Sequence, residues 1–406
     1  MNIWLVSIFE QTPIDNVFST RFNSIANEAL KRGHSITFFA STFKHNTKIQ
    51  RFQETHTEVI NANYKIVFVK SASYTKNISI ARLLSHYSFA KDVLIEMKTQ
   101  AKPDVILMAY PPVSLAKFVS TWAKQNKIPV ILDVIDPWPD AFVVPFPKYL
   151  HFLIKAVLFP IKLSTIKTLT NLTAPTSISK QYIDWGKSIN RKLSVCEVFY
   201  PAADYEFIRS RIDAHKTSKN GKFLSIVYAG SLALVYDINT ILKAAEILDA
   251  DYPDIRFFIA GSGLHQSKVL NYIRNHSNLE YFGRLSKEDL MKVYAMSDLG
   301  LTQYIKGTTQ SVTYKLFDLL SAGLPILNSL ESEMKEIILD NKVGLHNKPG
   351  DYKQLAENIL IFYNDKSKIK EYQNNGYELT IKLGDSKKVY SDFVKLLEQI
   401  SDKNAV

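Results

Sequence analysis

Glycine is nearly missing from the first half of this chain. Of the 14 glycines, only Gly33 and Gly186 fall within the first 200 residues, and the remainder follow residue 220. Glycine at the end of a strand lets the backbone approach a phosphate closely. We therefore expect a nucleotide to bind mainly to the second half, and we expect a domain boundary near residue 200.

Other absences narrow the class of protein. Cys196 is the only cysteine, so no disulfide can form within the chain, and its apolar neighbours favour a packing role. No run of 18 apolar residues suggests a membrane-spanning helix, and the N-terminus lacks the features of a signal peptide. With 46% apolar and 22% charged residues, the 406-residue chain is expected to be a globular, cytoplasmic protein.

Several nucleotide and metal motifs are absent or misplaced. The chain has no Walker lysine motif, no H-E-x-x-H and no C-x-x-C. Gly261-Ser-Gly263 follows an expected strand but lacks the third glycine of a dinucleotide fingerprint, so a dehydrogenase is not expected. Asp249-Ala-Asp251 has the spacing of a metal-binding D-x-D motif, but it falls at the expected amino edge of a sheet. We therefore expect no metal site.

Acidic residues are absent from Ala141 to Ile183, in a chain of net charge +11 and pI near 9.3. Lys148, Lys155 and Lys162 recur there every seven residues among large apolar side chains. This pattern is typical of an interfacial helix whose lysines face an anionic membrane surface. The alternative is a core helix with a solvated lysine stripe. Of the anionic partners that the charge allows, we expect a nucleotide and a membrane, and no nucleic acid.

Apolar runs bounded by turn residues alternate with helical periodicity, which predicts an α/β fold with two Rossmann-like domains facing a cleft. The expected domains are residues 1–200, residues 201–380, and a terminal helix in 381–406 that crosses back to the first domain. The expected strands of the first half are 3–9, 35–41, 65–70, 104–110, 129–136, 172–176 and 193–200. Those of the second half are 224–230, 256–261, 279–283, 299–304, 325–328 and 343–346.

A helix expected after Ser311 carries the most specific signal. Ser311 is the predicted N-cap, Gly323 ends the helix, and Lys315 and Asp318 lie on one face of its first turns. A lysine at that position opposes the helix dipole unless an anion lies nearby, so the pattern indicates a phosphate and ribose site. The alternative is an exposed pair between Lys315 and Asp318.

Asp136-Pro-Trp138 forms a second concentration of functional residue types. It follows a strand at its carboxyl end, where Asp136 would orient an acceptor hydroxyl and Trp138 would stack on a sugar or lipid. The alternative is that Asp136 caps the following turn. Arg284, after another strand, would approach a base or diphosphate, or stay solvated on a loop.

Taken in order, these segments resemble the GT-B glycosyltransferases of family 4, particularly the bacterial branch that builds O-antigen and capsule sugars. The resemblance spans the chain and rests on residues 32–37, 102–106, 136–140, 227–232, 258–263, 282–286, 311–318 and 322–325. It implies donor-binding roles for Gly230, Ser231, Gly261, Gly263, Arg284, Leu285, Gln310, Ser311, Lys315 and Asp318. It also implies acceptor-binding roles for Asn16, Asp136 and Trp138, with Asp136 and Lys315 as the catalytic residues.

The chain departs from the family at two points. Gln310 stands where the family has an acid eight residues before Asp318, and the N-terminal glycine loop is missing. An amide must then supply the hydrogen bond to the donor sugar.

The resemblance implies transfer of a hexosyl or N-acetylhexosaminyl group from a nucleotide-sugar, with UDP as the expected nucleotide, to a lipid-linked saccharide in surface polysaccharide synthesis. Retention of configuration, independence of metal and cofactor, and a peripheral location on the inner face of the plasma membrane are implied too. The alternatives are a sugar-nucleotide 2-epimerase of the same fold and a non-catalytic transferase relative.

Overall fold

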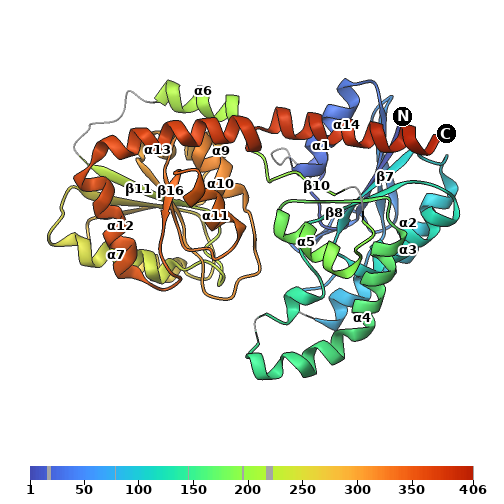
Figure 1. Ribbon diagram of the computed structural model, residues 1–406, viewed down its shortest axis with the longest axis horizontal. Coiled ribbons are helices and arrows are strands. Elements are labelled where there is room, and N and C mark those ends of the chain that lie inside the picture. Colours follow the sequence, from blue (N-terminus) through green and yellow to red (C-terminus); the bar gives the residue numbers. More distant parts are fainter. Residues whose placement is uncertain (16–19, 78, 145, 194–195, 216–222, 406) are drawn as a thin grey trace. The chain divides into compact units, whose positions relative to one another are not determined.

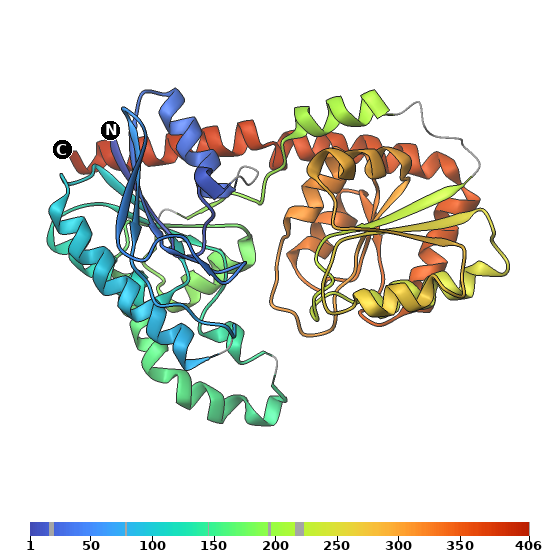
Figure 2. The same cartoon turned by 180° about the vertical axis from the view of Figure 1, so that it is seen from behind.

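The computed structural model describes residues 1–405 apart from 16–19, 78, 145, 194–195 and 216–222 (Figures 1 and 2). The chain forms two compact units. The first comprises Met1–Tyr200 together with Val389–Val406, and the second comprises Pro201–Lys388. Each unit is built on its own sheet of mostly parallel strands.

The sheet of the first unit has the strand order β10-β9-β8-β7-β1-β2-β6-β5. All neighbours are parallel except β5, which pairs antiparallel with β6. The strands are β1 (Asn2–Val6), β2 (Ser35–Ser41), β5 (His56–Asn61), β6 (Tyr64–Val69), β7 (Val105–Tyr110), β8 (Val130–Val134), β9 (Ala174–Ser177) and β10 (Glu197–Val198), with a separate hairpin of β3 (Phe43–Lys44) and β4 (Ile49–Gln50).

The central strands are rich in β-branched and aromatic residues and are buried on both faces, as parallel strands covered by helices must be. One face packs against helices α2, α3 and α5 and the end of α4 through a core that includes Trp4, Phe89, Leu115 and Tyr182. The helices of this unit are α1 (Arg21–Lys31), α2 (Ile80–Thr99), α3 (Val113–Gln125), α4 (His151–Asn171) and α5 (Lys180–Ile189).

The sheet of the second unit is wholly parallel and has the order β13-β12-β11-β14-β15-β16. Its strands are β11 (Leu224–Ala229), β12 (Ile255–Ala260), β13 (Leu279–Gly283), β14 (Leu299–Thr302), β15 (Ile326–Asn328) and β16 (Gly344–His346). Its helices are α6 (Tyr205–His215), α7 (Ile238–Asp249), α8 (Gln266–Tyr272), α9 (Lys287–Met296), α10 (Tyr314–Ser321), α11 (Glu333–Asp340), α12 (Tyr352–Asn364) and α13 (Lys366–Leu379).

The last helix, α14 (Ser386–Ala405), begins in the second unit and ends in the first. In the first unit its Phe393 ring lies 4.4 Å from the ring of Phe199, and the Arg21 guanidinium lies over the same Phe393 ring. Glu398 accepts hydrogen bonds from Arg32 and lies 2.8 Å from Nε2 of His34. These contacts complete the first unit with residues from the far end of the chain.

The predicted α/β architecture with two parallel sheets is confirmed, and a strand occurs at every predicted position. The hairpin β3–β4 and strand β5 were not predicted. Strand β5 is largely exposed and polar at the edge of its sheet, so it lacks the apolar run by which the others were recognised.

Helix α4 departs from the sequence-based expectation about membranes. The expectation that no segment is long and apolar enough to cross a membrane is wrong for Lys148–Asn171, which meets that description by length and composition alone. The lysines interrupt its apolar runs, but the mean hydropathy of the helix remains high enough for a membrane span. Its buried residues are confined to its C-terminal part, at Thr165, Thr168 and Leu169.

Candidate active site

In the second sheet, the strand order reverses direction at the neighbours β11 and β14, the position where parallel α/β sheets bind ligands beyond their carboxyl ends. Gly230 directly follows β11, and Gly261 directly follows β12. A Cβ atom on Gly261 would lie 1.7 Å from the carbonyl oxygen of Gly230, and both residues have φ of +143°. Only glycine fits this close approach, which brings the ends of the two strands together.

Lys315 lies at this point, on the first turn of α10. Its Nζ atom is buried 4.1 Å from the ring centroid of Tyr228 and 4.2 Å from that of Tyr236, and it has no hydrogen-bond partner among the described residues. Burial lowers the pKa of Lys315 from 10.5 to about 7. A buried cation held only by aromatic rings is costly to the free protein and well suited to receive an anion.

Two further buried polar atoms near the start of α10 lack partners among the described residues. They are Oε1 of Gln310 and Oγ of Ser311. The prediction that Ser311 is the N-cap is wrong, because Thr313 holds that position and Ser311 lies two residues before it. The Ser311 hydroxyl is consequently not used by the helix and stays available for a ligand.

Asp318 lies one turn after Lys315 on α10, and the two side chains form no ion pair. The alternative of an exposed Lys315–Asp318 pair is therefore wrong. Burial raises the pKa of Asp318 to about 6, and the charge of Lys287 partly opposes that rise. A carboxylate in this setting accepts hydrogen bonds readily, as a ribose hydroxyl pair would require.

The remaining predicted donor residues follow three adjacent strands. Ser231 is exposed after β11, and its carbonyl oxygen accepts a hydrogen bond of 2.6 Å from the Tyr228 hydroxyl. Gly263 lies in the loop after β12, and Arg284 and Leu285 follow β13, with Arg284 exposed. The sheet therefore brings Gly230, Gly261 and Lys315 close together and carries the other donor residues along the same edge.

In the first unit, Asp136 follows β8. Burial raises the pKa of Asp136 to about 6, and the charge of Arg82 partly opposes that rise. The hydrogen bonds of the following turn join backbone atoms, such as Trp138 N to the Asp136 carbonyl oxygen, so the carboxyl group does not cap it. The Trp138 side chain is only 9% exposed and packs between Phe142 and the Arg82 guanidinium. This packing suits a role in positioning Asp136 better than open stacking on a sugar.

Asn16, the third predicted acceptor residue, lies outside the described residues. A carboxyl group that the sequence interpretation passed over is Glu10, which comes shortly after β1. Burial raises its pKa to about 7, partly opposed by a hydrogen bond from Thr20 and by the charge of Arg21. Its place beyond a central parallel strand is the signal in the sequence that marks it as a candidate.

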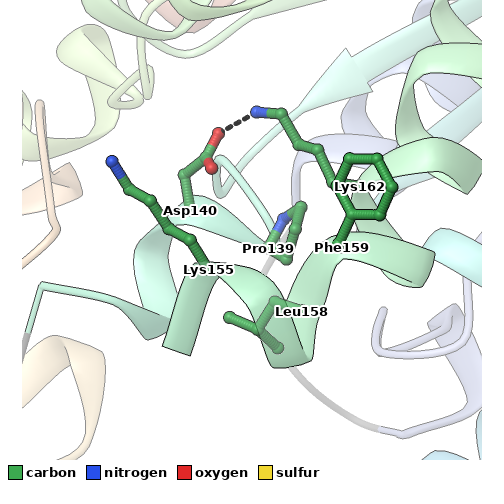
Figure 3. Close-up of a pocket in the computed structure, with 6 residues that line it drawn as sticks. All are labelled: Pro139, Asp140, Lys155, Leu158, Phe159 and Lys162. Carbon is green, nitrogen blue, oxygen red and sulfur yellow. Dashed lines mark hydrogen bonds and ion pairs between the residues drawn. The ribbon is translucent and has the colours of Figure 1, made fainter. Parts of the chain in front are cut away.

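Of the three predicted membrane lysines, Lys148 and Lys155 are exposed and Lys162 is partly buried. Lys162 forms an ion pair with Asp140, and both line a pocket of ≈ 320 Å³ together with Lys155, Pro139, Leu158 and Phe159 (Figure 3). Lys148 precedes α4 in a short 3-10 helix. Large apolar side chains of the same segment are exposed as well, with Phe152 at 79% and Val157 at 78%.

The Asp249-Ala-Asp251 motif lies at the amino edge of the second sheet, between α7 and β12, where Asp249 lies 2.8 Å from Nδ1 of His276. Within the described part of the chain, no group of three or more His, Cys, Asp or Glu side chains is arranged to hold a metal ion.

Comparison with known proteins places this geometry in a class. Over 98% of both chains, the fold matches sucrose-phosphate synthase from Thermosynechococcus elongatus with a TM-score of 0.73 at 12% identity. It also matches Anabaena HepE, crystallised in complex with UDP, over 98% of this chain and 99% of that one, with a TM-score of 0.68 at 10% identity. The fold is that of the GT-B glycosyltransferases.

The sequence of the second unit also matches a family of known proteins. Residues 210–379 match the family model described as glycosyl transferases group 1. The chain is 24% identical over 173 residues to chitobiosyldiphosphodolichol beta-mannosyltransferase of Candida glabrata, covering 40% of this chain and 38% of that protein. The chain thus matches less than two fifths of the length of such curated relatives.

Proposed function

We propose that this protein is a glycosyltransferase of family 4 that moves a sugar from a nucleotide-sugar to a lipid-linked saccharide. The observation that carries the proposal is the buried, unpartnered ammonium group of Lys315 at the sheet position where Gly230 and Gly261 meet. The nearby unpartnered atoms of Gln310 and Ser311 support it, since a diphosphate and a sugar would supply their missing hydrogen bonds.

In the proposed reaction, an acceptor hydroxyl attacks the anomeric carbon while the bond from that carbon to the diphosphate oxygen breaks. Lys315 and the N-terminus of α10 stabilise the negative charge that develops on the departing diphosphate. Asp318 binds the nucleotide ribose, and Gln310 binds the donor sugar through its amide. The acceptor oxygen attacks on the face from which the diphosphate leaves, so the configuration is retained. The departing diphosphate takes the acceptor proton, and no enzymic nucleophile or metal ion is needed.

The substrate classes are supported by the relatives. HepE was crystallised with UDP, and the Candida glabrata relative is named for a diphosphodolichol-linked acceptor. We take a UDP-linked hexose or N-acetylhexosamine as the donor and a saccharide on a lipid diphosphate as the acceptor. Synthesis of a bacterial surface polysaccharide, the O-antigen or capsule, is the process that would use this pair. In the first unit, Asp136 orients the acceptor hydroxyl, and Trp138 holds Asp136 in place.

A peripheral membrane location accompanies an acceptor of this kind. The apolar patch that would contact lipid consists of exposed side chains of α2, of Tyr149 and of the first part of α4: Ile80, Leu83, Leu84, Tyr87, Tyr149, Phe152, Leu153, Val157, Phe159 and Leu163. Helices α2, α3 and α4 lie side by side in Figures 1 and 2, and the rings of Tyr87 and Phe118 join α2 to α3.

The geometry of α4 favours lying in the interface over spanning the bilayer. Its C-terminal part is anchored, because Thr165 lies 3.0 Å from the Tyr110 hydroxyl and Lys117 donates to Ser164. The part before these contacts, 151–163, is about 20 Å long, which is shorter than the roughly 30 Å hydrocarbon core. We place the protein on the cytoplasmic face of the plasma membrane, with the acid-free segment 141–183 toward anionic lipid.

The experiment that tests the proposal offers purified protein a panel of UDP-, GDP- and other nucleotide-linked sugars, with and without lipid diphosphate saccharides and with and without EDTA. Transfer that requires the lipid acceptor and survives EDTA supports it. Conversion of the nucleotide-sugar without acceptor would indicate an epimerase. Absence of any turnover across the panel, with intact UDP binding, would indicate a non-catalytic relative. NMR of the product anomer tests retention.

A further inference from the structure

A second group of cations lies in the first unit, outside the proposed donor site. We call it the basic cluster and define it as His45, Lys48, Arg82 and His86. Nζ of Lys48 lies 3.3 Å from Nδ1 of His45, and Nε of Arg82 donates a 3.3 Å hydrogen bond to Nε2 of His86. Tyr74 joins the two halves, because its hydroxyl lies 2.6 Å from His45 and its ring lies beneath both Lys48 and Arg82.

The lysine and the arginine of this cluster lack a carboxylate partner. Lys48 donates to the Asn77 side-chain oxygen and Arg82 to the Asn77 carbonyl oxygen, and neither takes part in a salt bridge within the described residues. The other arginines before residue 190 are paired: Arg21 with Asp133, Arg32 with Glu28 and Glu398, and Arg51 with Asp15. The absence of a counter-ion distinguishes Arg82 from all three.

The neighbouring titratable groups leave the cluster positive. Burial and the nearby cations lower the pKa of His45 to about 4 and that of His86 to about 3, so both rings are neutral near pH 7. Burial together with the charge of Arg82 lowers the pKa of Lys48. The acid facing Arg82 is Asp136, whose own pKa burial raises to about 6. Among the described residues, Lys48 and Arg82 therefore have only the Asp136 carboxyl group nearby, and a multiply charged anion would balance their charge.

The cluster also adjoins an apolar surface. Arg82 lies on α2 among Ile80, Leu83 and Leu84, which are 76%, 50% and 63% exposed and belong to the apolar patch. Arg82 itself turns inward, with its guanidinium over the rings of Phe9 and Trp138. An anion at Arg82 would thus lie within one helical turn of side chains suited to contact a hydrocarbon chain.

We propose that Lys48 and Arg82 bind the phosphate or diphosphate that joins the acceptor saccharide to its lipid, with the lipid lying on the apolar patch. This inference rests on the proposed function and assigns its acceptor a subsite. A bound diphosphate supplies the counter-charge that Lys48 and Arg82 lack and places the attached sugar beside Asp136. Arg82, which faces both the anion and Asp136, then links acceptor binding to the carboxyl group that orients the acceptor hydroxyl.

The test uses farnesyl diphosphate as the probe, titrated calorimetrically into the full chain with saturating UDP, so that the donor site is occupied. We expect Lys48→Gln/Arg82→Gln to weaken its binding by about tenfold or more, because charge-assisted hydrogen bonds are lost. The matched control is Lys91→Gln/Lys98→Gln, which removes the same charge elsewhere on α2 and should bind as the wild type does. Arg82→Lys keeps the charge and should retain most of the affinity.

The outcomes separate this inference from the proposed function. Unchanged farnesyl diphosphate binding in a folded Lys48→Gln/Arg82→Gln variant, checked by circular dichroism, would overturn it even if UDP binds normally. Equal binding of inorganic pyrophosphate and farnesyl diphosphate would overturn the lipid-linked assignment. Weak binding of farnesol, which lacks the phosphates, supports the inference. Loss of UDP binding in Lys315→Met with farnesyl diphosphate binding preserved would show two separate anion sites.

Discussion

A Cβ atom at position 230 would lie 2.8 Å from Nζ of Lys315, so the absence of a side chain at Gly230 is what admits the lysine to the end of strand β11. Gly230 and Lys315 are separated by 85 positions along the chain, and the reversal of strand order between β11 and β14 brings them together. Predictions about the donor site follow from this contact.

Gly230→Ala should weaken UDP binding by about tenfold, because the new methyl group displaces the Lys315 ammonium group and φ of +143° is strained for alanine, at a cost on the order of 1–3 kcal/mol. Calorimetric titration with UDP measures the affinity. The control is Gly186→Ala in α5, where a Cβ would meet nothing within 4 Å and UDP binding should be unchanged. Equal UDP affinity in both variants would place the nucleotide elsewhere.

Lys315→Met should lose most UDP affinity and transfer activity while raising the thermal midpoint of the nucleotide-free protein. Its ammonium group is buried without a hydrogen-bond partner, so removing the charge relieves a penalty on the order of 1–3 kcal/mol. Differential scanning calorimetry with and without UDP separates the two effects. Lys335→Met, which removes an exposed lysine paired with Glu331, should change neither quantity appreciably.

UDP affinity should fall as the pH rises above about 7, since burial lowers the pKa of Lys315 from 10.5 to that value and only the ammonium form attracts a diphosphate. Stability moves the opposite way. Between pH 7 and 10.5 the unfolded chain holds a proton on Lys315 that the folded chain lacks, so this group's contribution to the free energy of unfolding rises with pH. Denaturation of wild type and Lys315→Met at several pH values should show that rise in the wild type alone.

Asp318→Asn should raise the donor KM more than it lowers kcat, because a ribose contact is made in the ground state and the transition state alike. Asp318→Asn should also remove the contribution that the protonated Asp318 carboxyl makes to the free energy of unfolding at low pH. With the folded pKa raised to about 6 against 3.8, this contribution is present below pH 3.8 and lost as the pH rises through 6. An unaltered donor KM would remove the ribose assignment.

The sequence predicted the sheets well because each parallel strand is buried on both faces and appears as an apolar run. Gly230 and Gly261 could be located for a related reason, since they directly follow such runs. Strand β5 and the unused hydroxyl of Ser311 were not predictable. The first has no apolar pattern, and the second depends on the helix starting at Tyr314 rather than two residues earlier.

The basic cluster was beyond sequence reasoning. His45 and Lys48 come from the turn between β3 and β4, whereas Arg82 and His86 come from α2, and no local pattern connects them. The sequence also does not reveal which arginines have a carboxylate partner. Within the part of the chain that the structure describes, Arg82 lacks one, whereas Arg21, Arg32 and Arg51 each have one. Such relationships depend on tertiary packing alone.

Substitution of the apolar patch should test the membrane proposal. Phe152→Ser/Val157→Ser should reduce binding to anionic vesicles at both low and high salt, because each apolar side chain buried in lipid contributes about 1.5–3 kcal/mol. Lys148→Glu/Lys155→Glu should reduce binding mainly at low salt, where each lysine contributes about 1 kcal/mol. Vesicle sedimentation measures both. If both double variants sediment like the wild type, the patch does not contact lipid.

Helix α14 affects the order in which the two units can fold during synthesis. The first unit has Phe393 beside Phe199 and Glu398 beside Arg32, and Phe393 and Glu398 are translated later than the whole of the second unit. The second unit, Pro201–Lys388, is already complete in sequence when they emerge. Whereas N-terminal domains ordinarily fold first during synthesis, here the N-terminal unit can complete its packing only after residues 389–405 have been translated. A premature stop before Val389 would therefore damage the part of the protein farthest from it in sequence.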